Sequence, residues 1–297
     1  MSRKLLFILN PQSGRRESRV RLFDLVDLFS RHHCIVTVCP TRMRSDATRF
    51  VQKHAREFDF VLCCGGDGTL NETVTGLMSL TYRPPLGYIP AGTTNDMANS
   101  LRLPRSLLRA AETVLQGQIR SHDIGTFHDG YFVYAAAFGA FTEVSYVTPQ
   151  PAKIALGPLA YLLEGIRRLP DIRPYRMTVE HDAQTITGDF LFGAVTNTHS
   201  IAGIRNPMPG EVHLDDGRFE VLLVRNPTTP KQLRRILTDL SRRKFDNENI
   251  LFFQTDRVLF ESETAVPWTI DGEDGGTHQR TEIMNLPRSI RFMTGER

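Results

Sequence analysis

The stretch that most constrains this chain is GGDGTLNE, residues 65–72. An apolar run at residues 58–64 precedes it and predicts a buried strand, and residues 70–80 can form a helix. Glycines remove the side chains that would hold a ligand away from the backbone, and they allow positive φ angles that turn successive N–H groups inward as an anion-binding nest. The helix start adds unpaired N–H donors and the positive end of its dipole. The stretch therefore predicts a phosphate-binding loop.

One carboxylate, Asp67, lies inside this predicted donor array. It would repel a bare phosphate, so its presence favours a divalent cation or a reacting proton at the same place. A tight strand-to-helix turn without a ligand is the alternative interpretation. The strand before the loop and the helix after it favour the functional one.

Four short apolar runs in the first part of the chain predict parallel strands, at residues 5–9, 35–39, 58–64 and 86–89. Helical patterns alternate with them, and Ser45 is expected to cap the helix that starts at Asp46. Strand, loop and helix in alternation predict a doubly wound α/β domain. Ligands bind such sheets at the carboxyl ends of the strands. We therefore expect one sheet edge to hold the polar loops at residues 10–14, 41, 65–72 and 90–96.

The pattern changes after residue 124, where short strand-like runs separated by turns predict a β-sandwich or barrel-like domain. The runs include residues 131–138, 185–192, 193–196, 257–261 and 266–270, and one of the turns is expected at His181-Asp182. Two helices are expected within it, at 158–168 and at 230–243, the second with Thr229 as its cap and Pro230 in its first turn. The first is apolar on most faces, which favours core packing over a role in receiving an acyl chain. The predicted domains are residues 1–124 and 125–284, and the segment 285–297 can rejoin the first domain through a strand at 289–293.

Composition is that of an ordinary globular protein, with 40% apolar and 23% charged residues. The net charge of +3 gives no argument for a nucleic-acid partner, and it suits an anionic nucleotide or an anionic membrane surface equally. None of the four cysteines has metal-ligand spacing, so they are expected to be buried hydrophobes of a reducing compartment. The histidines form no zinc motif. Without an apolar run of membrane-spanning length or a signal peptide, a cytoplasmic location is expected.

Five elements together carry a family resemblance: NPxSG at 10–14, GGDGTxNE at 65–72, PxGTxND at 90–96, DDG at 215–217 and DGE at 271–273. In these the chain resembles the soluble bacterial diacylglycerol kinases, lipid kinases whose catalytic domain is shared with sphingosine and ceramide kinases. GGDGT alone is also similar to NAD kinases and, more loosely, to phosphofructokinases. The NPxSG and PxGTxND elements favour the lipid kinases, and the resemblance covers essentially the whole chain.

The resemblance implies an active site in a cleft between an α/β nucleotide domain and a β-rich domain. It implies that Glu273 is the catalytic proton acceptor, with Asp67 and Asp271 beside it in the catalytic group. Asp67, Asp96 and Asp123 would form an acidic, Mg²⁺-linked network around the phosphates. In the second domain, the Asp216 side chain would bind another Mg²⁺ with the carbonyl groups of His213 and Arg218. The implied ATP contacts are Asn10, Pro11, Gln12, Ser13, Gly14, Thr41, Gly65, Gly66, Asp67, Gly68, Thr69, Leu70, Asn71 and Thr93.

Phosphoryl transfer to an alcohol needs charge neutralisation, alignment and an acceptor for the hydroxyl proton, and this residue set offers all three. The leading prediction is an ATP- and Mg²⁺-dependent lipid kinase that converts diacylglycerol to phosphatidate, with transient contact at the inner membrane surface and a homodimer as a further expectation. The alternatives are an NAD kinase with Asp67 as base and a non-catalytic lipid or nucleotide sensor. Locally, Asp216-Gly217 and Asp271-Gly272 are also ordinary turn sequences, and Asn95-Asp96 can simply cap a helix.

Overall fold

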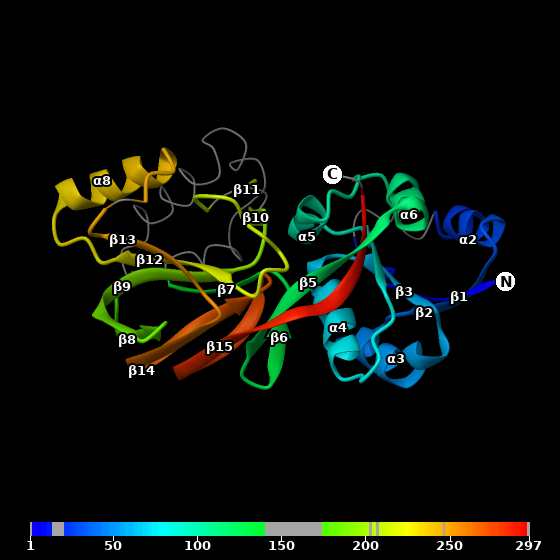
Figure 1. The fold of residues 1–297 in the computed structure, drawn as a ribbon, viewed down its shortest axis with the longest axis horizontal. Helices are drawn as coiled ribbons and strands as arrows, with labels where there is room; N and C mark the ends of the chain where they lie inside the picture. Colours follow the sequence, from blue (N-terminus) through cyan, green and yellow to red (C-terminus); the bar gives the residue numbers. More distant parts are fainter. Residues whose placement is uncertain are drawn as a thin grey trace. The chain divides into compact units, whose positions relative to one another are not determined.

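The computed structural model describes residues 2–13, 21–139, 174–201, 204–205, 208–245 and 247–295. The chain divides into two compact units, Met1–Ile124 with Pro287–Arg297, and Gly125–Leu286 (Figure 1). Two strands, β5 (Gln118–Phe127) and β15 (Glu273–Thr294), have residues in both units. The predicted helix at 158–168 and the predicted ATP contact Gly14 lie outside the described residues.

The first unit is built on a parallel sheet in the order β15–β4–β3–β1–β2. The predicted strands are present as β1 (Arg3–Leu9), β2 (Cys34–Pro40), β3 (Phe60–Gly65) and β4 (Leu86–Pro90). The end of β15 adds a fifth strand, with Phe292 opposite Leu86. β3 and β4 are buried along their whole length, because a sheet with helices on both faces exposes neither.

Helices cover both faces of this sheet (Figure 1). They are α2 (Leu22–Arg31), α3 (Asp46–His54), α4 (Asp67–Met78), α5 (Asp96–Ser100) and α6 (Leu107–Gln116). α2 and α6 pack together over one face, where Phe7, Phe29 and Val114 belong to one apolar cluster. α3 and α4 pack together in the layer on the other face. Cys63 and Cys64 are fully buried, and burial raises the pKa of the Cys63 thiol to about 12, as expected for an inert core cysteine.

The second unit is an antiparallel β structure in which sheet order runs β13–β12–β9–β7–β14–β15. Its strands are β6 (Gly130–Phe132), β7 (Ala135–Gly139), β8 (Tyr175–His181), β9 (Gln184–Thr196), β10 (Ser200–Ile201), β11 (Ile204–Arg205), β12 (Phe219–Arg225), β13 (Ile250–Thr255), β14 (Arg257–Ile270) and the first part of β15. β9 and β14 each pair with β8 at one end and β7 at the other, so the sheet folds around an aromatic core. The predicted α/β and β-rich classes are confirmed.

Several strand boundaries in the β unit differ from the sequence prediction. Residues 185–192 and 193–196 were expected as two strands but form the one strand β9, and residues 273–286, where no strand was expected, belong to β15. A single strand was expected over residues 131–138, but it is divided into β6 and β7 because the backbone amides at the break bind the carboxylate of Asp271. The runs 257–261 and 266–270 were expected as separate strands, but they form the one long strand β14, which contains register shifts. The second predicted helix is confirmed as α8 (Pro230–Ser241), where the Thr229 hydroxyl accepts a hydrogen bond from the N–H of Gln232 at 3.2 Å.

Candidate active site

The polar loops of the first unit begin side by side at the carboxyl edge of its sheet. Each loop continues the strand pairing by one residue. The N–H of Asn10 donates to the Cys64 carbonyl at 2.9 Å, that of Thr41 to Leu9 at 2.8 Å, and that of Ala91 to Gly65 at 2.8 Å. These bonds fix the starting points of all four predicted loops. The predicted convergence at one sheet edge is therefore confirmed.

The glycines of the GGDGT stretch allow two loop backbones to approach each other closely. Gly66 has φ −89° and ψ −175°, and helix α4 begins directly after it, three residues earlier than predicted. The expected nest of positive φ angles is therefore wrong, since Gly65, Gly66 and Gly68 all have ordinary backbone angles. A Cβ on Gly92 would lie 2.6 Å from the Cα of Gly66, and one on Gly65 would lie 2.6 Å from the Thr69 side chain. Two loop backbones touch here, and side chains would separate them.

The start of α4 provides the anion-binding features at this edge. The first intrahelical bond is donated by the N–H of Leu70 to Gly66 at 3.0 Å, so the earlier amides lie at the positive end of a twelve-residue helix. The Asn10 side-chain amide donates to the Thr69 hydroxyl at 3.0 Å and ties the first loop to this helix start. The side chain of Leu70 is buried, so only its backbone can face a ligand.

Asp67 and Asp96 bring two carboxylates to the same edge. Asp67 is 9% exposed and Asp96 is 3% exposed. Oδ2 of Asp67 accepts hydrogen bonds from the Thr94 hydroxyl at 3.4 Å and from the backbone N–H of Asp96 at 3.3 Å. Two buried carboxylates at one sheet edge can be stabilised by a bound cation, and hard oxygen donors are the ligands that Mg²⁺ prefers. The donor set therefore fits Mg²⁺.

Asn95 shapes the loop that leads to Asp96. Its φ is 50°, and its side chain makes no bond to α5. Instead the side chain accepts from the N–H of Gly92 at 2.9 Å and donates to the Gly92 carbonyl at 2.8 Å. The simple capping interpretation of Asn95 is thus wrong. The side chain closes the loop around Gly92 and leaves Thr93 exposed.

Glu72, the last residue of the motif, has a structural role. Its carboxylate accepts from the backbone N–H groups of Ser45 at 2.7 Å and Ala47 at 3.3 Å, so it caps the start of α3 from α4. The predicted cap by the Ser45 side chain is wrong, because Ser45 has φ 67° and makes no capping bond. Asp46 accepts backbone bonds from Arg42 and Met43, in the loop that begins at Thr41. These carboxylates hold that loop in place.

Asp123 is fully buried within the first unit, in β5. Its Oδ1 accepts a hydrogen bond from the N–H of Arg288 at 2.7 Å, at the point where β15 enters this unit. This bond gives one buried carboxylate oxygen a partner. The implied role in the phosphate network stays a prediction.

Asp271 is a buried carboxylate in the turn between β14 and β15. It is 3% exposed and accepts three backbone hydrogen bonds, from Val133 at 2.7 Å, Tyr134 at 2.9 Å and Ala135 at 3.0 Å. Its own N–H donates to the Ala135 carbonyl at 2.8 Å. Asp271 and Gly272 have φ angles of 49° and 84°, which define a type I′ hairpin turn. These contacts give Asp271 a positioning role.

Glu273 follows this turn directly. It is opposite Ile270 in the first pair of the β14–β15 hairpin, and its side chain is exposed. A carboxylate that is open to solvent beside a rigid turn is available to accept a proton. Asp271 thus fixes the backbone from which Glu273 projects.

The second-unit residues with an implied Mg²⁺ role lie in the loop before β12. Asp216 is exposed, and its Oδ1 accepts from the N–H of Arg218 at 2.9 Å. Sequence reasoning missed Glu220, which follows in β12 and is 1% exposed. Burial, with a smaller contribution from Asp216, raises the pKa of Glu220 to about 7. Glu220 accepts a hydrogen bond from the Gln254 side chain at 3.1 Å, and the implied Mg²⁺ site at Asp216 stays a prediction.

Together these features describe a protein of two units, one that can bind anions and one that presents a carboxylate. The first unit is a doubly wound sheet with an anion-binding edge, and the second is a β unit that presents a carboxylate from a rigid hairpin. Residues 4–127 match the family model of the diacylglycerol kinase catalytic domain, and residues 137–294 match that of the YegS C-terminal NAD kinase beta sandwich-like domain.

Named relatives agree with these matches. The chain is 35% identical to a diacylglycerol kinase of Bacillus subtilis (strain 168), over 96% of this chain and 94% of that protein. It is 32% identical to one of Staphylococcus haemolyticus, over 97% and 87% of the two chains. A crystal structure of a diacylglycerol kinase from Bacillus anthracis has the same fold, with a TM-score of 0.82 at 24% identity over 99% and 97% of the chains. The chain belongs to the bacterial diacylglycerol kinase family of lipid kinases. The predicted family is confirmed.

Among the helices of the described residues, none has the length and apolar character needed to cross a bilayer.

Proposed function

We propose that this chain transfers the γ-phosphate of ATP to the free hydroxyl group of diacylglycerol and releases phosphatidate and ADP. The observation that carries the proposal is the sheet edge where four polar loops meet the start of α4. The acceptor is proposed from the relatives, which are named diacylglycerol kinases. Family membership makes ATP the phosphate donor.

ATP is proposed to bind along the carboxyl edge of the first unit. The amides at the start of α4 suit its phosphates, because N–H groups at a helix start attract anions. The close contact of Gly66 and Gly92 lets backbone, rather than side chains, line this edge. The contacts are those implied by the motifs, from Asn10 to Ser13, at Thr41, from Gly65 to Asn71 and at Thr93.

Asp67 and Asp96 are the residues proposed to hold Mg²⁺ near the phosphates, with Asp123 in the same acidic network. When bound, the ion would neutralise charge on the phosphate oxygens. In the second unit, Asp216 is proposed as a ligand of a separate Mg²⁺ with the carbonyls of His213 and Arg218.

Glu273 is proposed as the proton acceptor. As the lipid hydroxyl oxygen forms its bond to the γ-phosphorus, the bond from that phosphorus to the β–γ bridging oxygen breaks and the hydroxyl proton passes to Glu273. ADP leaves with the bridging oxygen. This step requires Glu273 and the residues proposed to bind ATP to act on the same ATP molecule.

A lipid acceptor requires the protein to reach the membrane surface. We include in the proposal a cytoplasmic protein with transient contact to the inner membrane face, and a homodimer. Sedimentation with anionic vesicles tests the membrane contact, and complete absence of co-sedimentation at low salt would contradict it.

The decisive experiment supplies the full chain with ATP, Mg²⁺ and mixed micelles of diacylglycerol, beside a Glu273→Ala variant. Phosphatidate formed by the parent and lost in the variant, with ATP binding retained in calorimetry, supports both the reaction and the base. A parallel reaction with NAD tests the dinucleotide alternative. Phosphorylated NAD without phosphatidate overturns the proposal, and ATP binding without turnover of either substrate favours a sensor.

A further inference from the structure

The strand β15 contains a β-bulge close to Glu273. Gly275 and Gly276 together lie opposite the single residue Trp268, between two regular pairs of the β14–β15 hairpin. Gly276 has a φ angle of 80°, in the left-handed region that favours glycine. The turn at 271–272 bounds one side of the short segment that carries the proposed proton acceptor, and this bulge bounds the other.

The bulge is tightly packed where it faces β14. A Cβ on Gly275 would lie 2.6 Å from the side chain of Ile270 and 3.2 Å from the carbonyl oxygen of Trp268. Trp268 is 2% exposed and belongs to the aromatic core, which limits how far this strand can shift. Glycine permits the close approach, but two successive glycines also leave the backbone with high conformational freedom. A hydrogen bond to this backbone would reduce that freedom.

His278 makes such a hydrogen bond. Its Nε2 lies 3.0 Å from the carbonyl oxygen of Gly275. Because a carbonyl oxygen can only accept, Nε2 carries the proton and donates it. A Cβ on Gly276 would lie 3.1 Å from the same nitrogen, so the imidazole also packs closely against the second glycine. The side chain of His278 thus contacts both residues of the bulge.

Aromatic contacts hold the His278 ring in its orientation. The ring stacks on that of His128, with 3.6 Å between ring centres and 24° between the planes. Phe127, at the end of β5, approaches it edge to face with 5.7 Å between ring centres. Phe127 in turn contacts the Trp268 ring at 5.4 Å. A side chain that is packed on several sides keeps one rotamer, so its hydrogen bond stays directed at the bulge.

We propose that His278 is a positioning residue for Glu273. Its hydrogen bond to Gly275 holds the bulge, and the bulge and the Asp271 turn together fix the backbone from which the Glu273 carboxylate projects. Small displacements of a reacting group cost large factors in rate, so a fixed backbone at this place raises kcat. The inference deepens the proposed function, and it rests on the role of Glu273 in that proposal.

The experiment separates the hydrogen bond from the shape of the ring. His278→Phe keeps the stacking surface but removes the donor, so kcat for phosphatidate formation from diacylglycerol micelles should fall about tenfold, with the KM for ATP at the parent value. His278→Gln should restore most of the parental kcat, because its amide nitrogen can donate from nearly the same place. His128→Phe is the matched control. It changes the stacked partner and leaves the Gly275 bond intact, so it should keep the parental kcat.

Hydrogen exchange at the bulge gives a readout that does not depend on turnover. The N–H of Gly276 donates to the Asp274 carboxylate at 2.8 Å. We expect this amide to exchange faster in His278→Phe than in the parent or in His278→Gln, because the bulge opens more often without the Gly275 bond. Melting temperatures show whether each variant is folded. If His278→Phe melts early, His278→Asn replaces it, since its amide nitrogen takes the place of Nδ1 rather than Nε2.

Three results would overturn the inference. One is a parental kcat in His278→Phe. Another is an equal fall of kcat in His278→Phe and His278→Gln, which would mean that the hydrogen bond does not matter. The third is unchanged exchange of the Gly276 amide in His278→Phe. The proposed function fails in a different way, through a parent protein that forms no phosphatidate, and the exchange experiment would still show whether His278 holds the bulge.

Discussion

The β unit contains two hairpins whose turns have the same backbone conformation but whose aspartates lie in different surroundings. One turn is Asp182-Ala183 and the other is Asp271-Gly272, and both central residues of each have positive φ angles. In each, the residue after the turn pairs with the residue before it, Gln184 with His181 and Glu273 with Ile270. Local sequence thus produces the same type I′ turn twice.

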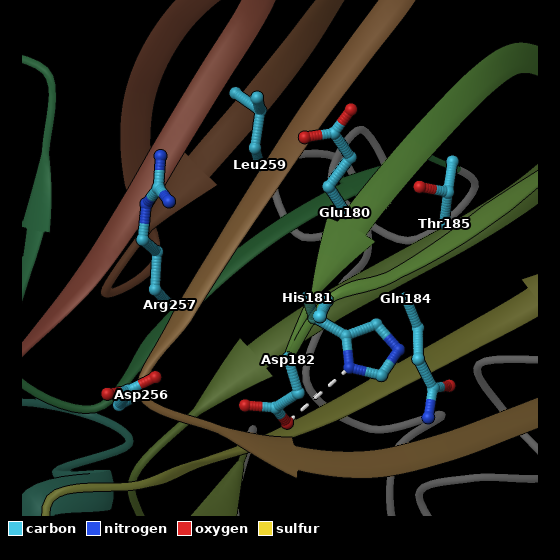
Figure 2. Close-up of a pocket in the computed structure, with 9 residues that line it drawn as sticks. Glu180, His181, Asp182, Gln184, Thr185, Asp256, Arg257 and Leu259 are labelled. Atoms are coloured by element: carbon cyan, nitrogen blue, oxygen red, sulfur yellow. Dashed lines mark ion pairs between the residues drawn. The ribbon is translucent and has the colours of Figure 1, made fainter.

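The aspartates of the two turns have opposite environments. The Asp271 carboxylate is buried and accepts three backbone amides. The Asp182 carboxylate is partly exposed, and its described ion-pair contact is the neighbouring His181. The first turn is fixed by a distant segment of chain, whereas the aspartate of the second contacts the residue directly before it (Figure 2). The same turn conformation is therefore held by distant backbone amides in one place and by local contacts in the other.

The largest difference should appear in catalysis, at the residue after each turn. Glu273→Gln removes the proposed proton acceptor and keeps the shape of the side chain, so we expect kcat to fall by about 10²–10⁴ with ATP affinity unchanged. Gln184→Glu adds a carboxylate at the equivalent place of the other hairpin and should leave kcat at the parent value. The measurement is phosphatidate formation from diacylglycerol micelles. A Glu273→Gln enzyme of parental kcat would remove Glu273 from the mechanism.

The second largest effect concerns the two aspartates themselves. Asp271→Asn replaces an acceptor of three amides with a group that has one acceptor oxygen, so at least one buried N–H loses its partner. We expect a loss of about 3 kcal/mol in unfolding free energy. Asp182→Asn, at an exposed position that tolerates Asn, should change it by less than about 0.5 kcal/mol.

Urea unfolding of both variants tests this difference. Equal losses in the two variants would mean that the amide contacts of Asp271 do not stabilise the fold.

Sequence patterns predicted these turns unevenly, and the reason is physical. Asp-Gly is a strong turn signal, so Asp271-Gly272 was found, whereas the other turn was predicted one residue early, at 181–182, because alanine rarely adopts positive φ. The parallel sheet and its loops were predictable because buried strands read as continuous apolar runs. The role of Glu72 as a cap for α3 was not predictable from sequence patterns, because it depends on a contact between two separate helices. Nor could apolar patterning show which carboxylates are buried against amides.

A smaller effect is expected at the second residue of each turn. Gly272→Ala places a Cβ at φ 84°, with the Tyr134 hydroxyl 3.7 Å away, so the loss is conformational rather than steric. We expect about 1 kcal/mol of destabilisation. Ala183→Gly relieves a similar strain at φ 61° but adds chain entropy to the unfolded state, so the two effects nearly cancel.

The measurement is the melting temperature, where Gly272→Ala should lower it by a few degrees and Ala183→Gly should leave it within about one degree. A lower melting temperature for Ala183→Gly would show that this alanine makes a stabilising contact.

The last prediction extends the comparison to a carboxylate of the first unit, and the expected effect depends on pH. Backbone hydrogen bonds from Arg42 and Met43, together with the Arg49 side chain, lower the pKa of Asp46 from 3.8 to about 2, the Arg42 bond being the largest cause. A carboxylate whose pKa is lowered by folding stabilises the native state above its unfolded pKa, and this contribution disappears as pH falls through the folded value. Asp46→Asn should therefore lower the melting temperature at pH 7, and the difference from the parent should shrink between about pH 4 and about pH 2. A difference that stays constant over this range would mean that the ionised form of Asp46 is not what holds the loop after β2, and the amide contacts would then act through geometry alone.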